Sequence, residues 1–159
     1  MEPIRVEGEK IVLRSVDSSD IDTILLWENS TTEPQYGVYD EQYSRGDVAR
    51  FVENQQRYSL AETEQLRLMI CSHEGERLGC IDLTEYDGKK AFVSILIFDS
   101  GNRGKGLGSE ALQVLVSYAL SLRLHVLYAC ILPENKPSIS LFSKVGFAEL
   151  DNNLFAYFL

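Results

Sequence analysis

One segment of this chain has the residue types of a phosphate-binding loop. Asp99-Ser-Gly-Asn-Arg-Gly-Lys-Gly-Leu-Gly108 carries glycines at 104, 106 and 108, and two cations, Arg103 and Lys105, lie among them. Glycines let a backbone approach a bulky phosphate because they lack a Cβ atom. The residues that follow predict a helix, and the first N–H groups of a helix are unpaired and carry partial positive charge. We therefore expect residues 103–108 to bind a phosphorylated cofactor.

The spacing of the glycines narrows the choice of cofactor. A dinucleotide fingerprint needs G-x-G-x-x-G with an acidic residue about 20 positions further on. Here the glycines fall as G-x-G-x-G, and Tyr128 occupies the position of the acid. A P-loop needs G-x-x-x-x-G-K-[ST], and Leu107 stands where its lysine would be. The pattern that is present is Arg-x-x-Gly-x-Gly, at Arg103, Gly106 and Gly108.

Two elements must position this loop. Residues 91–98 are apolar and β-branched, which predicts a strand, and residues 109–122 place apolar side chains at helical spacing. A later segment, residues 135–147, begins with Asn-Lys-Pro and ends with Lys-Val-Gly-Phe. Proline suits the first turn of a helix and glycine suits its left-handed end, so a second short helix is predicted there. One further strand, over residues 124–132, fits between the two helices.

Together these motifs resemble the acetyl-CoA-binding loop and the late helix of the GNAT N-acetyltransferase superfamily. Leu26-Trp27-Glu28-Asn29 is similar to the end of the first helix in the branch that contains the ribosomal-protein N-terminal acetyltransferases and the spermidine acetyltransferases. The resemblance covers essentially the whole chain, as one domain over residues 1–159. It implies direct transfer of an acetyl group, in a ternary complex, from acetyl-CoA to a primary amine. That amine is either a polyamine-like small molecule or a protein N-terminus.

The elements before the loop agree with this family. An alternating strand is predicted at residues 9–14, a capping box at Ser19–Asp22 opens a first helix, and residues 44–57 form a second helix. Strands at 65–72 and 77–85 follow, and Asp87-Gly88 predicts a hairpin into the strand before the loop. The expected fold class is α/β (α+β): a mixed, mostly antiparallel sheet of six or seven strands with helices on both faces.

The resemblance also assigns residues to the cofactor. Ile95 and Ile97 should line a slot for the pantetheine arm, made by a splay between strand 91–98 and the next strand, with backbone partners at Ile97 and Phe98. The pyrophosphate should lie on the amides of Arg103, Gly104, Lys105, Gly106, Leu107 and Gly108. Three further contacts, Asn135, Ser138 and Phe142, come from the late helix.

The groups that move protons depart from the family pattern. Relatives often have a glutamate where this chain has Phe92, and a tyrosine where it has Phe142. Asp82 is the first candidate for a replacement base or an amine anchor, although it could equally be a solvated strand residue. Ser138 could lie near the leaving thiolate, as a serine does in some relatives, or could simply start the late helix.

The acceptor site is expected at the first helix and the segment after it, because these cover the substrate in the family. Candidate contacts are Trp27, Glu28, Glu33, Tyr36, Tyr39, Tyr43 and, from the strand of Asp82, Glu85. The aromatic residues among them could also be ordinary packing. Two other functions stay open: a CoA-binding domain without catalysis, which the phenylalanines at 92 and 142 favour, and a protein whose loop binds another phosphate, such as a nucleotide.

Composition limits the partners. The chain has 159 residues, 45% of them hydrophobic, and a net charge of −9, which disfavours nucleic acid and suits a cationic acceptor or simply solubility. It has no apolar run of membrane-spanning length and no signal-peptide pattern. Three cysteines without metal-ligand spacing indicate a reducing, cytoplasmic location and no metal site, and their places in predicted strands indicate buried thiols. A homodimer is also possible, since relatives often pair through late strands.

Overall fold

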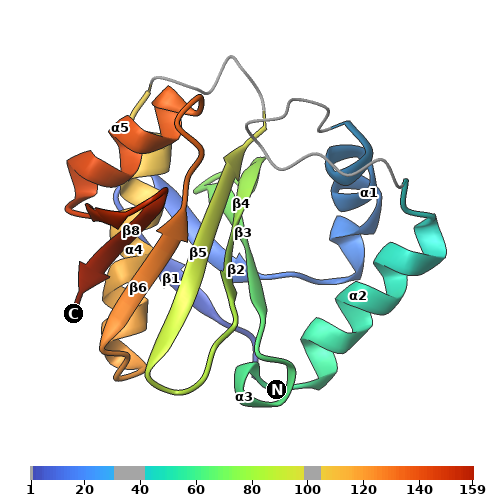
Figure 1. Cartoon of the computed structure of the whole chain (residues 1–159). Coiled ribbons are helices and arrows are strands. Elements are labelled where there is room, and N and C mark those ends of the chain that lie inside the picture. Colours follow the sequence, from blue (N-terminus) through green and yellow to red (C-terminus); the bar gives the residue numbers. More distant parts are fainter. Residues whose placement is uncertain (1, 31–41, 99–104) are drawn as a thin grey trace.

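The computed structural model describes residues 2–30, 42–98 and 105–159. These residues form an eight-stranded sheet with the strand order β1-β2-β3-β4-β5-β6-β8-β7 (Figure 1). The strands are β1 Arg5–Glu7, β2 Ile11–Ser15, β3 Leu66–Ser72, β4 Arg77–Thr84, β5 Lys90–Ile97, β6 Val126–Cys130, β7 Ala148–Asp151 and β8 Leu154–Phe158. Neighbouring strands are antiparallel, except that β5 and β6 are parallel.

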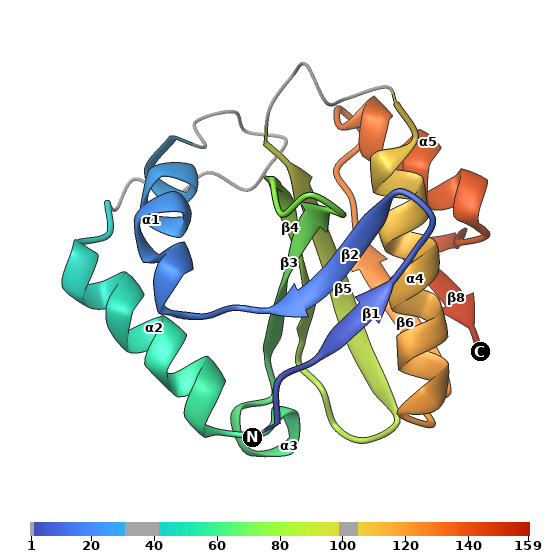
Figure 2. The same ribbon diagram turned by 180° about the vertical axis from the view of Figure 1, so that it is seen from behind.

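Helices cover both faces of the sheet, as predicted. They are α1 Ile21–Ser30, α2 Arg45–Arg57, α3 Leu60–Thr63, α4 Leu107–Ser121 and α5 Lys136–Val145, with a 3-10 turn at Ser18–Asp20. Figures 1 and 2 show α4 and α5 on one side of the sheet and α1 and α2 on the other. Within the described residues, no helix is both long and apolar enough to span a membrane.

Alternation along the strands divides the core into two layers. On β3, Leu68 and Ile70 pack with α4, whereas Met69 and Cys71 pack with α1 and α2. Successive strand side chains point to opposite faces, so each strand supplies both layers. The layer under α1 and α2 holds fewer residues, and charged and partly exposed side chains also lie on that face of the sheet.

Three local predictions need correction. The sheet has eight strands because Arg5–Glu7, too short to show alternation, pairs with β2. The capping box lies at Asp17 and Asp20, not at Ser19–Asp22, and it opens the 3-10 turn that precedes α1. The short helix α3 was not predicted; a capping box between Ser59 and Glu62 begins it.

The parallel pair β5 and β6 separates soon after it starts. β5 pairs with β4 along almost its whole length, from Phe92 to Ile97, but with β6 only from Lys90 to Phe92. Beyond that point the two ribbons diverge toward the end at which β5 leads to the glycine-rich loop (Figure 1). The predicted splay between these strands is therefore present in the backbone, and we use the name β5–β6 cleft for this unpaired stretch of the two strands.

Candidate functional site

The backbone of β5 presents hydrogen-bonding groups to the β5–β6 cleft. Phe98 donates its N–H to the carbonyl of Leu78 at 3.1 Å, continuing the antiparallel ladder with β4. Backbone groups of successive residues point alternately to the two sides of a strand. Those of Ile95 and Ile97 therefore point away from β4, toward the cleft. The backbone position predicted for Ile97 fits this geometry, whereas the N–H of Phe98 is used within the sheet.

The N-terminus of α4 lies at the mouth of this cleft. A Cβ atom built on Gly108, in the first turn of α4, would lie 3.7 Å from Ile97 of β5 and 3.4 Å from Leu141 of α5. The helix therefore begins where β5 ends, against α5. Its first-turn amides and its dipole are directed at the position where an anion would enter the cleft.

Gly106 gives this helix an open start. It is the residue before the first turn, has a φ of 79°, and a Cβ atom placed on it would meet nothing within 4 Å. No side chain caps α4 within the described residues. Lys105 is exposed beside it, while Arg103 and Gly104 lie outside the described residues. The described part of the loop thus fits a bulky anion on unpaired amides.

Residues of the late helix have structural contacts of their own. The side-chain oxygen of Asn135 accepts a hydrogen bond from the Ser138 N–H at 3.3 Å and so begins α5. Phe142 is buried and packs edge-on against Phe147, with ring centroids 4.9 Å apart. Ser138 is partly buried in the first turn of α5. Their contacts with a cofactor stay predictions.

Asp82 is buried in an ion pair with a residue that the sequence reasoning missed. Arg67 on β3 is its partner in the strand register. The Nε of Arg67 lies 2.9 Å from Oδ1 of Asp82, and its Nη2 lies 2.8 Å from Oδ2. The alternative that Asp82 is a solvated strand residue is therefore wrong. Both carboxylate oxygens accept charge-assisted hydrogen bonds, so a base role would require Asp82 to give up this pair.

Arg67 also connects the sheet to α1 and α2, the two helices that cover this face of the sheet. Its Nη1 donates to Oε1 of Glu28 on α1 at 2.7 Å, and its guanidinium carbon lies 5.0 Å from the ring centre of Phe51 on α2. Burial would lower the pKa of Arg67, but the charge of Asp82 and the hydrogen bonds to it raise this pKa well above its usual range. Arg67 is thus a permanent cation between Glu28 and Asp82.

One detail of the β3–β4 hairpin explains why Arg67 was missed. The register shifts by one residue between Ile70 and Cys71, next to the turn. Counting back from the turn without this bulge would pair Arg67 with Ile81 rather than with Asp82. A one-residue slip moves a side chain to the other face of the sheet. The sequence signal for the pair is a basic and an acidic residue on the two strands of a predicted hairpin. Without knowledge of the bulge, however, the sequence does not show that these two residues are opposite each other.

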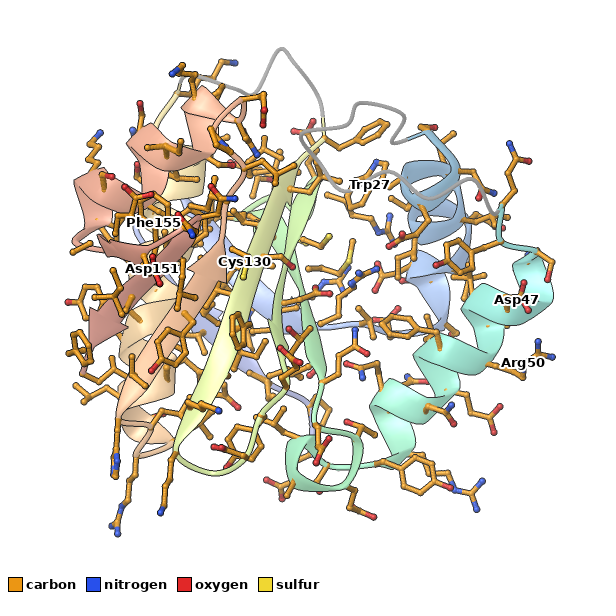
Figure 3. The ribbon with its side chains drawn as sticks, viewed as in Figure 1. Trp27, Asp47, Arg50, Cys130, Asp151 and Phe155 are labelled. Carbon is orange, nitrogen blue, oxygen red and sulfur yellow. The ribbon has the colours of Figure 1, made fainter. Side chains whose placement is uncertain are left out.

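An open hollow of about 650 Å³ lies between α1, α2 and the sheet. Its wall contains Glu28 and Arg67, and Tyr43 of the predicted acceptor residues also lines it; the other lining residues are Ile24, Gln42, Asp47, Val48, Arg50, Phe51 and Gln65. Trp27 projects from α1 toward the sheet (Figure 3), and its ring stacks on Phe98 with centroids 5.5 Å apart.

The other residues predicted to contact the acceptor do not lie at the hollow within the described part of the chain. Glu33, Tyr36 and Tyr39 lie outside the described residues. Glu85 is exposed just past the end of β4, beside the start of β5, and so lies at the opposite end of β5 from the loop. Glu85 is not among the described residues that line the hollow, and its contact with the acceptor stays a prediction.

The cysteines also differ from one another. Cys71 and Cys80 are buried, and burial raises the pKa of Cys80 to about 12, as expected of inert thiols. Cys130 is exposed, so the expectation that it is buried is wrong. It ends β6 in the region where β5 no longer pairs with that strand. Phe92 and Tyr128, in the last paired position, pack their rings 5.4 Å apart.

Comparison with known proteins identifies the family. The profile of the acetyltransferase (GNAT) domain matches residues 10–148. The acetyltransferase YwnH of Bacillus subtilis (strain 168) is 31% identical over 145 residues, covering 87% of this chain and 85% of that protein. An N-acetyltransferase 9-like protein of Nematostella vectensis is 43% identical over 65 residues, covering 40% of this chain and only 32% of that protein.

A solved structure has the same fold. Spermidine N-acetyltransferase from Vibrio cholerae, in complex with CoA and spermine, is similar with a TM-score of 0.79 at 17% identity, over 94% of this chain and 93% of that chain. With the profile match, these findings confirm the predicted family and fold. The chain belongs to the GNAT acetyltransferase family, whose acetyl donor is acetyl-CoA.

Proposed function

We propose that this protein transfers an acetyl group from acetyl-CoA directly to a primary amine in a ternary complex. The observation that carries the proposal is the β5–β6 cleft with, at its mouth, the N-terminus of α4, which no described side chain caps. The pyrophosphate binds the amides from Lys105 to Gly108, together with Arg103 and Gly104. The pantetheine arm lies along Ile95 and Ile97, and the amine approaches from the side of α1 and α2.

The chain's own groups account for binding and for polarisation of the thioester. A backbone N–H of β5 that points into the cleft donates a hydrogen bond to the thioester carbonyl and stabilises the negative charge that develops there. Asn135 holds the start of α5 beside the cleft. Ser138, in the first turn of that helix, is the hydroxyl proposed to hydrogen-bond the departing thiolate and to pass it a proton that the hydroxyl takes up from solvent in the same step.

We propose that the amine loses its proton to solvent rather than to a carboxylate of the protein. Phe92 replaces the expected glutamate, and the oxygens of Asp82 are held by Arg67. An alkyl amine has a pKa of about 10.4 when unperturbed. The value of kcat/KM should therefore rise about tenfold per pH unit from pH 7 to pH 9. A plateau reached near pH 7 would instead show that a group of the protein accepts the proton.

The second candidate is a CoA-binding domain that has lost catalysis. The observation that favours it is the pair of apolar side chains, Phe92 and the buried Phe142, at the two family positions for proton transfer. This candidate predicts tight CoA binding with no thiol release across a broad panel of amines.

The test compares two glycines of the same conformation. Gly106 and Gly75 both have positive φ, 79° and 91°, and both have open space around the Cβ position, but Gly75 lies in the β3–β4 turn. Gly106→Trp should abolish stabilisation by acetyl-CoA in a thermal-shift titration, whereas Gly75→Trp should leave it unchanged. Equal binding by both variants would refute the loop assignment. Stabilisation of the wild type by ATP or NAD but not by CoA would refute the donor.

A further inference from the structure

The charges around the hollow do not cancel. Glu28 and Asp82 are two carboxylates that share one guanidinium, Arg67, so this cluster carries one excess negative charge. The other ion pair on the hollow's wall, Asp47 with Arg50 at 2.7 Å, is neutral. A partly buried charge without a counter-ion is costly, and a bound cation would remove that cost.

The excess charge is presented to the hollow by Glu28. Asp82 uses both oxygens on Arg67, and its side chain is 7% exposed. Glu28 uses only Oε1, and its side chain is 33% exposed on the wall of the hollow. Among the described residues, Oε2 of Glu28 has no hydrogen-bond partner. An ammonium group could bind there by a charge-assisted hydrogen bond, with Tyr43 on the same wall.

The position of Glu28 relative to the cleft sets the expected distance between the reacting nitrogen of the acceptor and a group bound at Glu28. The reacting amine belongs beside β5, and Arg67, which holds Glu28, lies on β3, two strands further along the sheet. Neighbouring strands are about 4.8 Å apart, so the two positions are separated by about 10 Å. Between them the sheet presents Leu96 and Cys80, which with Trp27 line a small gap ending at Arg67 and Glu28. Apart from the two charged groups, this lining is largely apolar and suits methylene groups.

We propose that the acceptor is a small linear amine with a second positive charge, and that Glu28, held by Arg67, binds that second charge. This inference rests on the proposed acetyl transfer and goes beyond it by choosing between the two expected acceptor classes and by naming the residue that binds the second charge. Arg67 is a positioning residue, because its bond to Oε1 fixes the carboxylate and leaves Oε2 toward the hollow.

The test uses α,ω-diaminoalkanes of increasing length, each compared with the monoamine of the same length, in an assay of thiol release from acetyl-CoA. KM should be lowest for the diamine whose nitrogens are separated by about 10 Å. Glu28→Gln should raise that KM about tenfold or more with little change in kcat, and should leave the KM of the monoamine unchanged. The control is Glu53→Gln, which removes an exposed charge from α2 outside the hollow's lining and should change neither value.

Each other outcome has a distinct meaning. Equal loss with monoamine and diamine would overturn the proposal, because Glu28 would then act on the reacting amine or on the fold; thermal unfolding of the variant separates these two. A preference for acceptors with a carboxylate would overturn the proposal in favour of a contact with Arg67. A preference for peptide N-termini would overturn it in favour of a larger acceptor. Absence of thiol release with every amine, despite binding of acetyl-CoA, would refute the proposed function itself.

Discussion

Two ion clusters attach α1 to the sheet, and they differ in net charge and in completeness. In the first, Asp20, just before α1, lies between Arg14 of β2 and Arg77 of β4, and Asp17 lies 3.8 Å from Arg14, so the charges cancel. In the second, Arg67 lies between Glu28 and Asp82, which leaves one excess negative charge. Their similar layout makes the difference between them informative.

The first cluster is saturated. Asp20 accepts hydrogen bonds from Arg14 at 2.8 Å, from Arg77 at 2.6 Å and from the Asp17 N–H at 2.9 Å, and it is fully buried. The second cluster leaves one oxygen of Glu28 for the hollow. A saturated cluster can only hold elements together, whereas an unsaturated one beside a hollow can also bind a ligand. The comparison separates a charge cluster that is complete within the fold from one that can still accept a ligand, within the same layer.

The largest expected effect on stability comes from removing the carboxylate of Asp20 from the first, saturated cluster. Asp20→Asn leaves Arg77 without a carboxylate and Arg14 with only the half-exposed Asp17, 3.8 Å away, and should lower the free energy of unfolding by about 4 to 5 kcal/mol. Urea denaturation would measure it. The fraction that stays folded should bind acetyl-CoA normally, since Asp20 precedes α1, on the face of the sheet opposite to α4; a specific loss of affinity would contradict the structural assignment.

A smaller loss of stability is expected at the unsaturated cluster. Arg67→Met should cost about 3 kcal/mol, because Glu28 is partly solvated and only Asp82 is left buried and unpaired. Replacing both partners, as Arg67→Met with Asp82→Leu, should recover most of that stability, because buried ion pairs often give way to apolar residues without loss. Turnover of the diamine should not recover with it. Recovery of both would show that Arg67 does not position Glu28.

The pH dependence of stability distinguishes the clusters further. Burial alone would raise the pKa of Asp20, but the hydrogen bonds from Arg14 and Arg77 outweigh this and hold it at about 2. The unfolded chain has an Asp pKa near 3.9. The contribution of Asp20 is therefore complete above about pH 4 and is lost as the pH falls toward 2. In that range the wild type should lose stability more steeply than Asp20→Asn; parallel curves would contradict the assigned pKa.

The smallest effect is expected at an exposed pair on the same helix. Asp22 of α1 and Arg45 of α2 are 2.9 Å apart, but their side chains are 80% and 61% exposed. Asp22→Asn should change the free energy of unfolding by less than about 1 kcal/mol, because exposed pairs are solvated and screened. A change comparable with that of Asp20→Asn would show that burial does not explain the difference between the pairs.

Much of the scaffold could be predicted from local residue patterns. Ser44, Asn135 and Gly146 lie at helix ends because their own side-chain or backbone preferences act within a few residues. The strands form where the sequence predicts them, apart from β1. The separation of β5 from β6 was expected from the resemblance to the family. The capping box of the first helix was misplaced by two residues, since several Ser and Asp residues in a row offer competing caps.

The candidate site was predictable only in part. Gly106 and Gly108 lie where their spacing indicated, because a loop and a helix N-terminus form from neighbouring residues. Arg67 was missed and Asp82 was given a different role, because their meeting depends on a bulge in β3. Cys130 was expected to be buried, but its exposure depends on where two strands part.

By itself the sequence determined the family, the order of helices and strands, and the glycine-rich start of α4, since the patterns that reveal them lie in residues close in the chain. Only the tertiary structure decided which charges meet. Glu28, Arg67 and Asp82 come from three elements, and their shared wall exists because strand register and helix packing bring distant residues within hydrogen-bonding distance. The physical reason is that the energy of a charge depends on its burial and on its partners, and neither of these is a property of the residue alone.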